Sequence, residues 1–230
     1  MSASQTSSDW LPLLLQQSWL DDLAPELKVI FAVSSLTFIP LAVIAMTAFT
    51  RIIIVLSLLR HALGLQQTPP NSVLIALSLF LTLFAMSGVF SQIQAQAILP
   101  YLHGQIELGT AIPQVIQPLK AFMLSQTDEQ HFIRVLDMAS VAPPQNAEQV
   151  SLTHLVPAFM LSELTLAFKM AFLIFLPFLM IDLVVASSLM ALGMIMVPPI
   201  TVSLPLKIMV FILIDGWTLV TGSLVQSFSQ

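Results

Sequence analysis

The chain has 230 residues, of which 57% are apolar and only 8% are charged, whereas soluble proteins carry about 25% charged residues. Its net charge of −5 and its lack of a basic patch exclude a nucleic-acid partner. The absence of cysteine excludes disulfides, thiolate metal sites and cysteine nucleophiles. The apolar residues are gathered into long blocks. Because an α-helix satisfies its own backbone hydrogen bonds inside a bilayer, these blocks predict an all-α integral membrane protein.

Residues 1–28 are predicted to form an N-terminal arm. The first 20 residues contain no Lys or Arg, and the apolar run Leu11–Leu15 is short and interrupted by Pro12. A signal peptide would show a basic start and a longer apolar core. We therefore expect a mature, weakly amphipathic arm, with the alternative that a signal was removed upstream.

Residues 29–102 are predicted to form a first apolar helical hairpin. Its second arm follows Pro69–Pro70, which can open a helix at the first turn. The connection between the arms carries Arg51 and Arg60 and no acidic residue. The positive-inside rule therefore places this connection on the cytoplasmic side.

Residues 103–150 are predicted to form a polar helical insert outside the membrane. One short helix is expected to begin at Pro118. A second is expected to follow a capping box at Thr127–Gln130 and to run through Met138 until Pro143 stops it. Acidic residues outnumber basic ones here, so we expect the insert and both termini on the periplasmic side.

Residues 151–230 are predicted to form a second apolar hairpin. The stretch 183–206 has no charged residue and exceeds the about 20 residues that span a bilayer as a helix. Prolines inside the apolar blocks should kink the helices and favour packing against protein. The predicted turn contains Gly193, Met194, Ile195, Met196, Pro198 and Pro199. Since methionine is flexible and polarizable, a ring of such turns would form a deformable seal.

Five charged residues interrupt the tract 155–228: Glu163, Lys169, Asp182, Lys207 and Asp215. Each costs about 2.5–3.5 kcal/mol or more at hydrocarbon depth unless it is paired or hydrated. If the chain turns back at Pro198, Asp182 and Asp215 reach similar depth, and no pair closes within the hairpin. Their partners are then expected from another segment or another subunit.

Two other interpretations of these charges remain open. Long basic side chains near helix ends reach the lipid headgroups, which suits Arg51 and Arg60 but not Asp182. A proton relay would need carboxylates and histidines at one depth, and the last apolar block has no histidine.

No catalytic or cofactor-binding motif is present. The seven glycines form no GxG, GxxxG or phosphate-binding loop, and neither HExxH nor GxSxG occurs. The four histidines have no partner at metal-ligand spacing, and His131 near Asp128 is typical of a solvated helix face. We therefore expect no enzyme activity, no cofactor and no metal. A small ion channel or secondary transporter is the alternative function, but it should show paired half-repeats with broken helices, and no repeat is evident.

The sequence resembles the FliP/SctR family, the export-gate subunits of type III secretion systems. The resemblance covers about residues 36–228 and rests on SLTHLVPAFMLSELTLAFKMAFLIFLPFLMIDLVVASSLMALGMIMVPPITVSLPLKIMVFILIDGWTLVTGSLVQSF, MTAFTRIIIVLSLLRHALG and TPPNSVLIALSLFLTLFAMS. The VPP at 197–199 and the ending GSLVQSF are more similar to the flagellar branch than to the injectisome branch.

The resemblance implies a subunit of the flagellar export gate in the bacterial inner membrane, within the basal body. Several copies would assemble with FliQ-like and FliR-like subunits into a helically staggered ring, in contact with lipid and other export apparatus proteins. Unfolded flagellar proteins would pass through its centre. The family also implies that hairpins can be lifted out of the bilayer once assembled, so apolar blocks need not be spans.

The resemblance also implies residue roles. The family's methionine-rich gasket falls on Met194, Ile195 and Met196, with Ile where the pattern usually has Met. Glu163 and Lys207 match positions of a cross-subunit ion pair. The inter-subunit polar network is expected to include these two residues together with Lys169, Asp182, Asp215 and Arg51.

Overall fold

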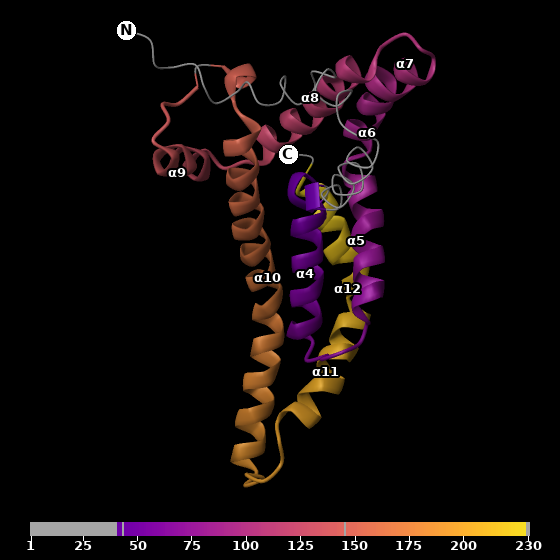
Figure 1. Ribbon diagram of the computed structural model, residues 1–230. Helices are drawn as coiled ribbons and strands as arrows, with labels where there is room; N and C mark the ends of the chain where they lie inside the picture. The colour runs from indigo at the N-terminus through magenta and orange to yellow at the C-terminus, as the bar shows by residue number, and fades with distance from the viewer. Residues whose placement is uncertain (1–40, 43, 145, 229–230) are drawn as a thin grey trace, which may run out of the picture.

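The computed structural model describes residues 41–42, 44–144 and 146–228, and over these ranges the chain is helical without a strand. The predicted N-terminal arm and the first part of the first apolar block lie outside the described residues. The helices form an elongated stem with a group of helices across one end (Figure 1). The all-α prediction is confirmed.

The stem is built from α4 (Phe49–Ala62), α5 (Asn71–Ala85), α10 (Leu152–Ala191), α11 (Ile200–Leu213) and α12 (Gly216–Gln226). Beyond α5 the chain continues through α6 (Ser87–Ile93), a π-helical segment (Gln94–Ile98) and α7 (Leu99–Leu102). The insert contributes α8 (Leu108–Gln126), α9 (Glu129–Ala139) and a short 3₁₀ turn (Ala147–Gln149). Both α8 and α9 pack directly on α10.

Among the described helices, α10 is by itself long and apolar enough to cross a membrane. Up to three spans result if two bent pairs each count as one, α5 with the helix that follows it and α11 with α12. The 40 residues of α10 extend about 60 Å at 1.5 Å per residue, which is about twice the hydrocarbon thickness of a bilayer. Part of α10 must therefore lie outside the hydrocarbon layer.

The breaks of the two bent helix pairs do not lie at prolines. Pro157, Pro177 and Pro205 are accommodated inside continuing helices. The two bends, of 67° and 64°, lie at the breaks between α5 and α6 and between α11 and α12. At the second break Asp215 adopts the left-handed conformation (φ 49°), and a Cβ on Gly216 would lie 2.2 Å from the Phe211 ring. A close helix–helix approach, rather than a proline, therefore shapes this break.

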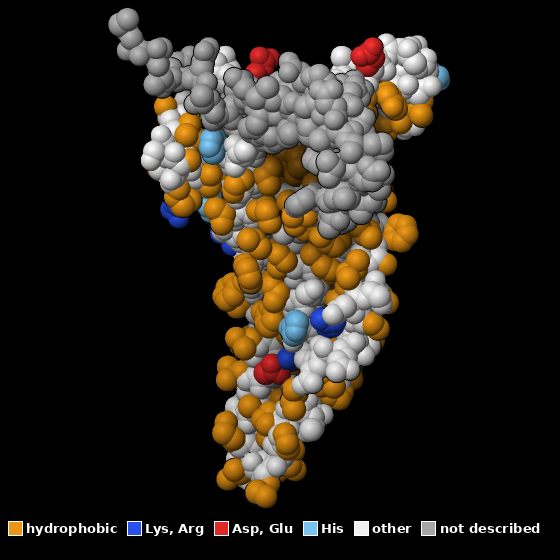
Figure 2. Space-filling view, viewed as in Figure 1, with side chains coloured by type: hydrophobic (Ala, Val, Ile, Leu, Met, Phe, Trp, Pro, Cys, Tyr) orange, Lys and Arg blue, Asp and Glu red, His pale blue; other side chains and the backbone are white. Residues whose placement is uncertain are grey.

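The buried core is centred on α4. Ile52, Val55, Leu56 and Leu59 are fully buried, and their spacing places them on one helix face against α10 and α5. Outside this core, apolar side chains cover most of the visible stem (Figure 2). Since large apolar surfaces are not left in water, the stem is suited to lipid or to protein partners.

The insert differs from the sequence-based prediction in two local details. The helix α8 begins at Leu108, so Pro118 lies inside it and does not start it. The expected capping box does not form: Asp128 is the N-cap and accepts from the Gln130 amide at 2.8 Å. Thr127 instead donates to the Met123 carbonyl at 2.6 Å, because it still belongs to the end of α8. The predicted helix through Met138 is confirmed.

Candidate functional site

A fully buried arginine joins the start of α4 to the middle of the fold. Arg51 Nε donates to Glu163 Oε2 at 2.9 Å, and Nη2 donates to the other oxygen of the same carboxylate. Both side chains have no solvent exposure. This two-pronged geometry is the strong form of an arginine–carboxylate pair, and it ties α4 to α10.

The remaining Arg51 donors contact the residue that follows α12 and the end of α8. Nη1 donates to Ser227 Oγ at 2.9 Å and to the Ser227 carbonyl at 3.2 Å, and Nη2 also donates to Gln126 Oε1 at 3.0 Å. The guanidinium lies 3.8 Å from the centre of the Phe228 ring, a favourable cation–π contact. We call Arg51, Glu163, Gln126, Ser227 and Phe228 the arginine hub.

A second ion pair lies further along the stem, between α10 and α11. Lys207 Nζ donates to Asp182 Oδ2 at 2.6 Å and to the Ala62 carbonyl at 3.2 Å. The Ala62 carbonyl belongs to the last turn of α4, where backbone acceptors have no helical partner and a cation is favoured. Lys207 thus joins three helices with one ammonium group.

This pair corrects the prediction that no pair closes within the second hairpin. The predicted equal depth of Asp182 and Asp215 is also wrong, because Lys207 is the residue at the level of Asp182. Asp215 lies up to about 12 Å further along at 1.5 Å per residue. The physical reason is that α10 already ends at Ala191 and α11 begins at Ile200, so the reversal is centred before Pro198 and brings an earlier residue of α11 to the level of Asp182.

The six predicted network residues therefore fall into two groups. Four pair within the chain, as Arg51–Glu163 and Asp182–Lys207, so Glu163 and Lys207 do not pair with each other here. Lys169 and Asp215 are exposed on the stem, and no described residue pairs with either.

The predicted gasket residues lie in the loop at the far tip of the stem (Figure 1). Gly193 ends α10 with φ 75°; its amide donates to Met190 O at 3.0 Å, and the Met194 amide donates to Leu189 O at 2.9 Å. These two bonds are the Schellman motif, which favours glycine at this position. They leave Met194, Ile195 and Met196 projecting, 46%, 85% and 95% exposed.

Sequence reasoning missed a polar joint between the insert and α10. Ser162 Oγ donates to Ala158 O and accepts from the Asp128 amide at 3.0 Å, while His131 Nδ1 lies 3.1 Å from the same oxygen. Because the Ser162 proton is already committed, His131 is the donor in this contact. His131 was predicted to lie on a solvated face. Its partner was not recognisable, because a serine inside an apolar tract carries no signal of its own.

A buried lysine connects α8 to the end of the insert. Lys120 Nζ donates to the Glu148 carbonyl at 2.8 Å. Burial lowers the pKa of Lys120, and the nearby Glu148 carboxylate opposes that shift in part. Over the described part of the chain, no group of His, Asp and Glu has the geometry to hold a metal ion.

Comparison with known proteins gives the family. Residues 32–224 match the FliP family. The chain belongs to the FliP family. It is 50% identical over 212 residues to the flagellar biosynthetic protein FliP of Pectobacterium carotovorum subsp. carotovorum, covering 92% of this chain and 81% of that protein.

Two further FliP relatives match a similar share of this chain. The FliP of Cereibacter sphaeroides is 49% identical over 203 residues, covering 88% of this chain and 67% of the relative. The FliP of Bacillus subtilis is 43% identical over 208 residues, covering 90% and 94%. The FliP match includes both ion pairs, the tip loop and three residues of the arginine hub, Arg51, Gln126 and Glu163. Ser227 and Phe228 of the hub lie beyond the matched range. The resemblance stated from the sequence motifs is confirmed.

Proposed function

We propose that this chain is a core subunit of the flagellar type III export gate. With further copies of itself and with FliQ-like and FliR-like subunits, it forms the channel through which unfolded flagellar proteins cross the bacterial inner membrane. The observation that carries the proposal is the FliP family match over residues 32–224. The role is translocation without covalent chemistry, and the insert lies on the periplasmic side.

The tip loop supports this role physically. A loop whose Ile195 and Met196 side chains are almost fully exposed is unfavourable at the end of a stem in an isolated subunit. In a ring, the loops of neighbouring subunits cover one another and enclose a narrow apolar constriction. Met194 and Met196 can rearrange around a passing chain because their side chains are unbranched and flexible.

The length of α10 supports the proposed location in a basal body. A helix about twice as long as the hydrocarbon layer is thick cannot span it along the membrane normal without extending beyond it. In the proposed gate, part of each stem is surrounded by other subunits and by other export apparatus proteins, and the rest contacts lipid.

One observation favours a small ion channel or secondary transporter instead. Each apolar hairpin ends in a helix broken by more than 60°, and paired broken helices mark the substrate site in several transporters. In that function, Asp215 at the second break would line the substrate path.

The mass of the purified particle separates these two functions. The tagged chain would be co-expressed with its genomic neighbours, extracted in mild detergent and weighed by native mass spectrometry. We expect a particle with several copies of this chain and smaller apolar partners. A chain that remains a stable monomer or simple dimer beside its neighbours would overturn the gate and support the transporter.

A further inference from the structure

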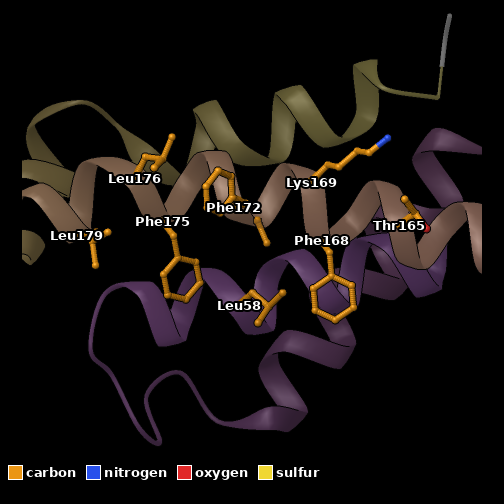
Figure 3. A pocket seen from close by; sticks show the side chains of 9 residues that line it. Leu58, Thr165, Phe168, Lys169, Phe172, Phe175, Leu176 and Leu179 are labelled. Carbon is orange, nitrogen blue, oxygen red and sulfur yellow. The ribbon is translucent and has the colours of Figure 1, made fainter.

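An open apolar groove runs along the outer side of α10. Its volume is about 790 Å³, and it is lined by Leu58 of α4 and by α10 residues from Thr165 to Leu179. Figure 3 shows Phe168 and Phe175 extending on either side of Leu58, while Lys169 extends in the opposite direction from its own helix. The groove therefore combines aromatic walls with one cation at its edge.

The cation is unmatched on this surface. Lys169 is exposed, and no described residue offers it a carboxylate. Its neighbours Phe168 and Phe172 are 59% and 64% exposed, so the ammonium group stands in an apolar environment. A charge in such surroundings requires an anionic partner or water.

The complementary feature lies at the break between α11 and α12. Asp215 is exposed, and although it occupies the N-cap position of α12, its carboxylate makes no capping bond. Exposed apolar side chains surround it in sequence: Ile212, Leu213, Ile214 and Leu219. The break is thus an exposed apolar surface that carries one unpaired anion, Asp215. The groove is an apolar surface that carries one unpaired cation, Lys169.

Within the described part of the chain the two charges form no ion pair, and the features that carry them lie on different helices of the stem. Figure 1 shows α10 along one side of the stem and α11 with α12 along the other for much of its length. Contact between different surfaces on opposite sides of a subunit generates a ring or a helix of copies.

The axial positions of the two charges are compatible with such contact. Measured from the Asp182–Lys207 pair, Lys169 lies about 20 Å along α10 and Asp215 at most about 12 Å along α11 and the break, at 1.5 Å per residue. A small displacement of one copy along the stem axis, together with the reach of the lysine side chain, covers the remaining difference.

We propose that the groove on α10 of one copy receives the α11–α12 break of the next copy, and that Lys169 pairs there with the neighbour's Asp215. The proposal rests on the export-gate function and assigns a subunit contact within it. The competing occupant is a phospholipid whose phosphate meets Lys169, but that occupant leaves Asp215 unmatched.

A double-mutant cycle tests the ion pair in the co-expressed particle. The variants are Lys169→Gln, Asp215→Asn and both together; asparagine is chosen because it tolerates the left-handed backbone that Asp215 adopts. Each single variant should lower the yield of multimer by about tenfold, and the double variant should be no worse than either single. If the double variant loses multimer yield by the product of the two single losses, the ion-pair proposal is wrong. It is also wrong if the single variants leave the yield unchanged.

Thiol cross-linking tests the contact independently, because the natural chain has no cysteine. Phe172→Cys combined with Leu213→Cys should give a ladder of covalent multimers when membranes holding the assembled particle are treated with a short bis-maleimide. The matched control combines Leu213→Cys with Met138→Cys, an exposed residue of α9, and should give none. No ladder from the first pair would overturn the contact.

The outcomes also separate this proposal from the gate function and from lipid binding. If the unmodified chain forms no multimer, the gate function itself fails. If it does, and only the cycle and the ladder fail, the contact alone is wrong. Native mass spectra in which Lys169→Gln loses phosphatidylglycerol while Asp215→Asn retains full multimer would assign the groove to lipid and overturn the proposal.

Discussion

The arginine hub and the tip loop differ in how far the chain itself satisfies their side chains. In the hub every guanidinium donor has a partner within the chain, and α4, α8, α10 and the last residues meet around it. The tip loop consists mainly of apolar side chains, of which Ile195 and Met196 are almost fully exposed. The hub finds all of its contacts within the chain, whereas the tip loop needs contacts from neighbouring subunits of an assembly. Substitutions should therefore destabilise the chain at one end and alter only the assembled channel at the other.

The largest expected effect on the chain comes from breaking the hub. Glu163→Gln leaves the buried Arg51 without its counter-ion, and removing one partner of a buried pair costs about 3–5 kcal/mol. The measurement is the denaturation midpoint in detergent, together with the amount of protein in the membrane. Glu129→Gln in α9 is the matched control, because it makes the same chemical change at an exposed carboxylate.

Replacing both hub charges sharpens this result. The pair Arg51→Met with Glu163→Leu should be less destabilised than Glu163→Gln, since no uncompensated charge remains. A Glu163→Gln chain as stable as the Glu129→Gln chain would show that the hub does not hold the helices together.

A smaller effect is expected at the joint between the insert and α10. Ser162→Ala leaves the Asp128 amide and His131 without their acceptor. Because both contacts are only partly buried, the cost should lie at or below about 1 kcal/mol, the low end of the range for an unsatisfied buried donor. Hydrogen exchange should increase across α9 and remain unchanged in α4. Ser187→Ala, at an exposed serine of α10, is the control. Unchanged exchange in α9 would mean that apolar packing alone docks the insert.

The smallest effect on stability is expected at the tip. Replacing both Met194 and Met196 by Ala should change chain stability by no more than about 0.5 kcal/mol, because both side chains are largely exposed. In the assembled gate the same change should raise ion conductance, measured as leak across the membrane, without loss of multimer. Val202→Ala on α11, also exposed, is the matched control. Conductance equal to that of the control would remove the gasket role.

Local elements were predictable because their signals are local. The helix through Met138 and the reversal of the chain between α10 and α11 follow from residues adjacent in sequence. The start of α8 and the position of the sharp bends were not predictable in the same way. Proline disfavours a helix by itself, but tertiary packing held Pro113, Pro118 and Pro177 inside helices and placed the break at Asp215.

The sequence by itself determined that the chain is an all-helical protein apolar enough for a membrane, with charges inside its apolar tracts and an apolar loop. These properties follow from composition and local pattern, which do not depend on how the helices pack. Only the tertiary structure decided which charges are matched within the subunit. Arg51 meets Glu163 across 112 positions, and Lys207 meets Asp182 because α10 ends at Ala191 and α11 begins at Ile200. Ion pairing requires a distance of a few ångströms in space, and separation in sequence carries no information about it until the helices have packed.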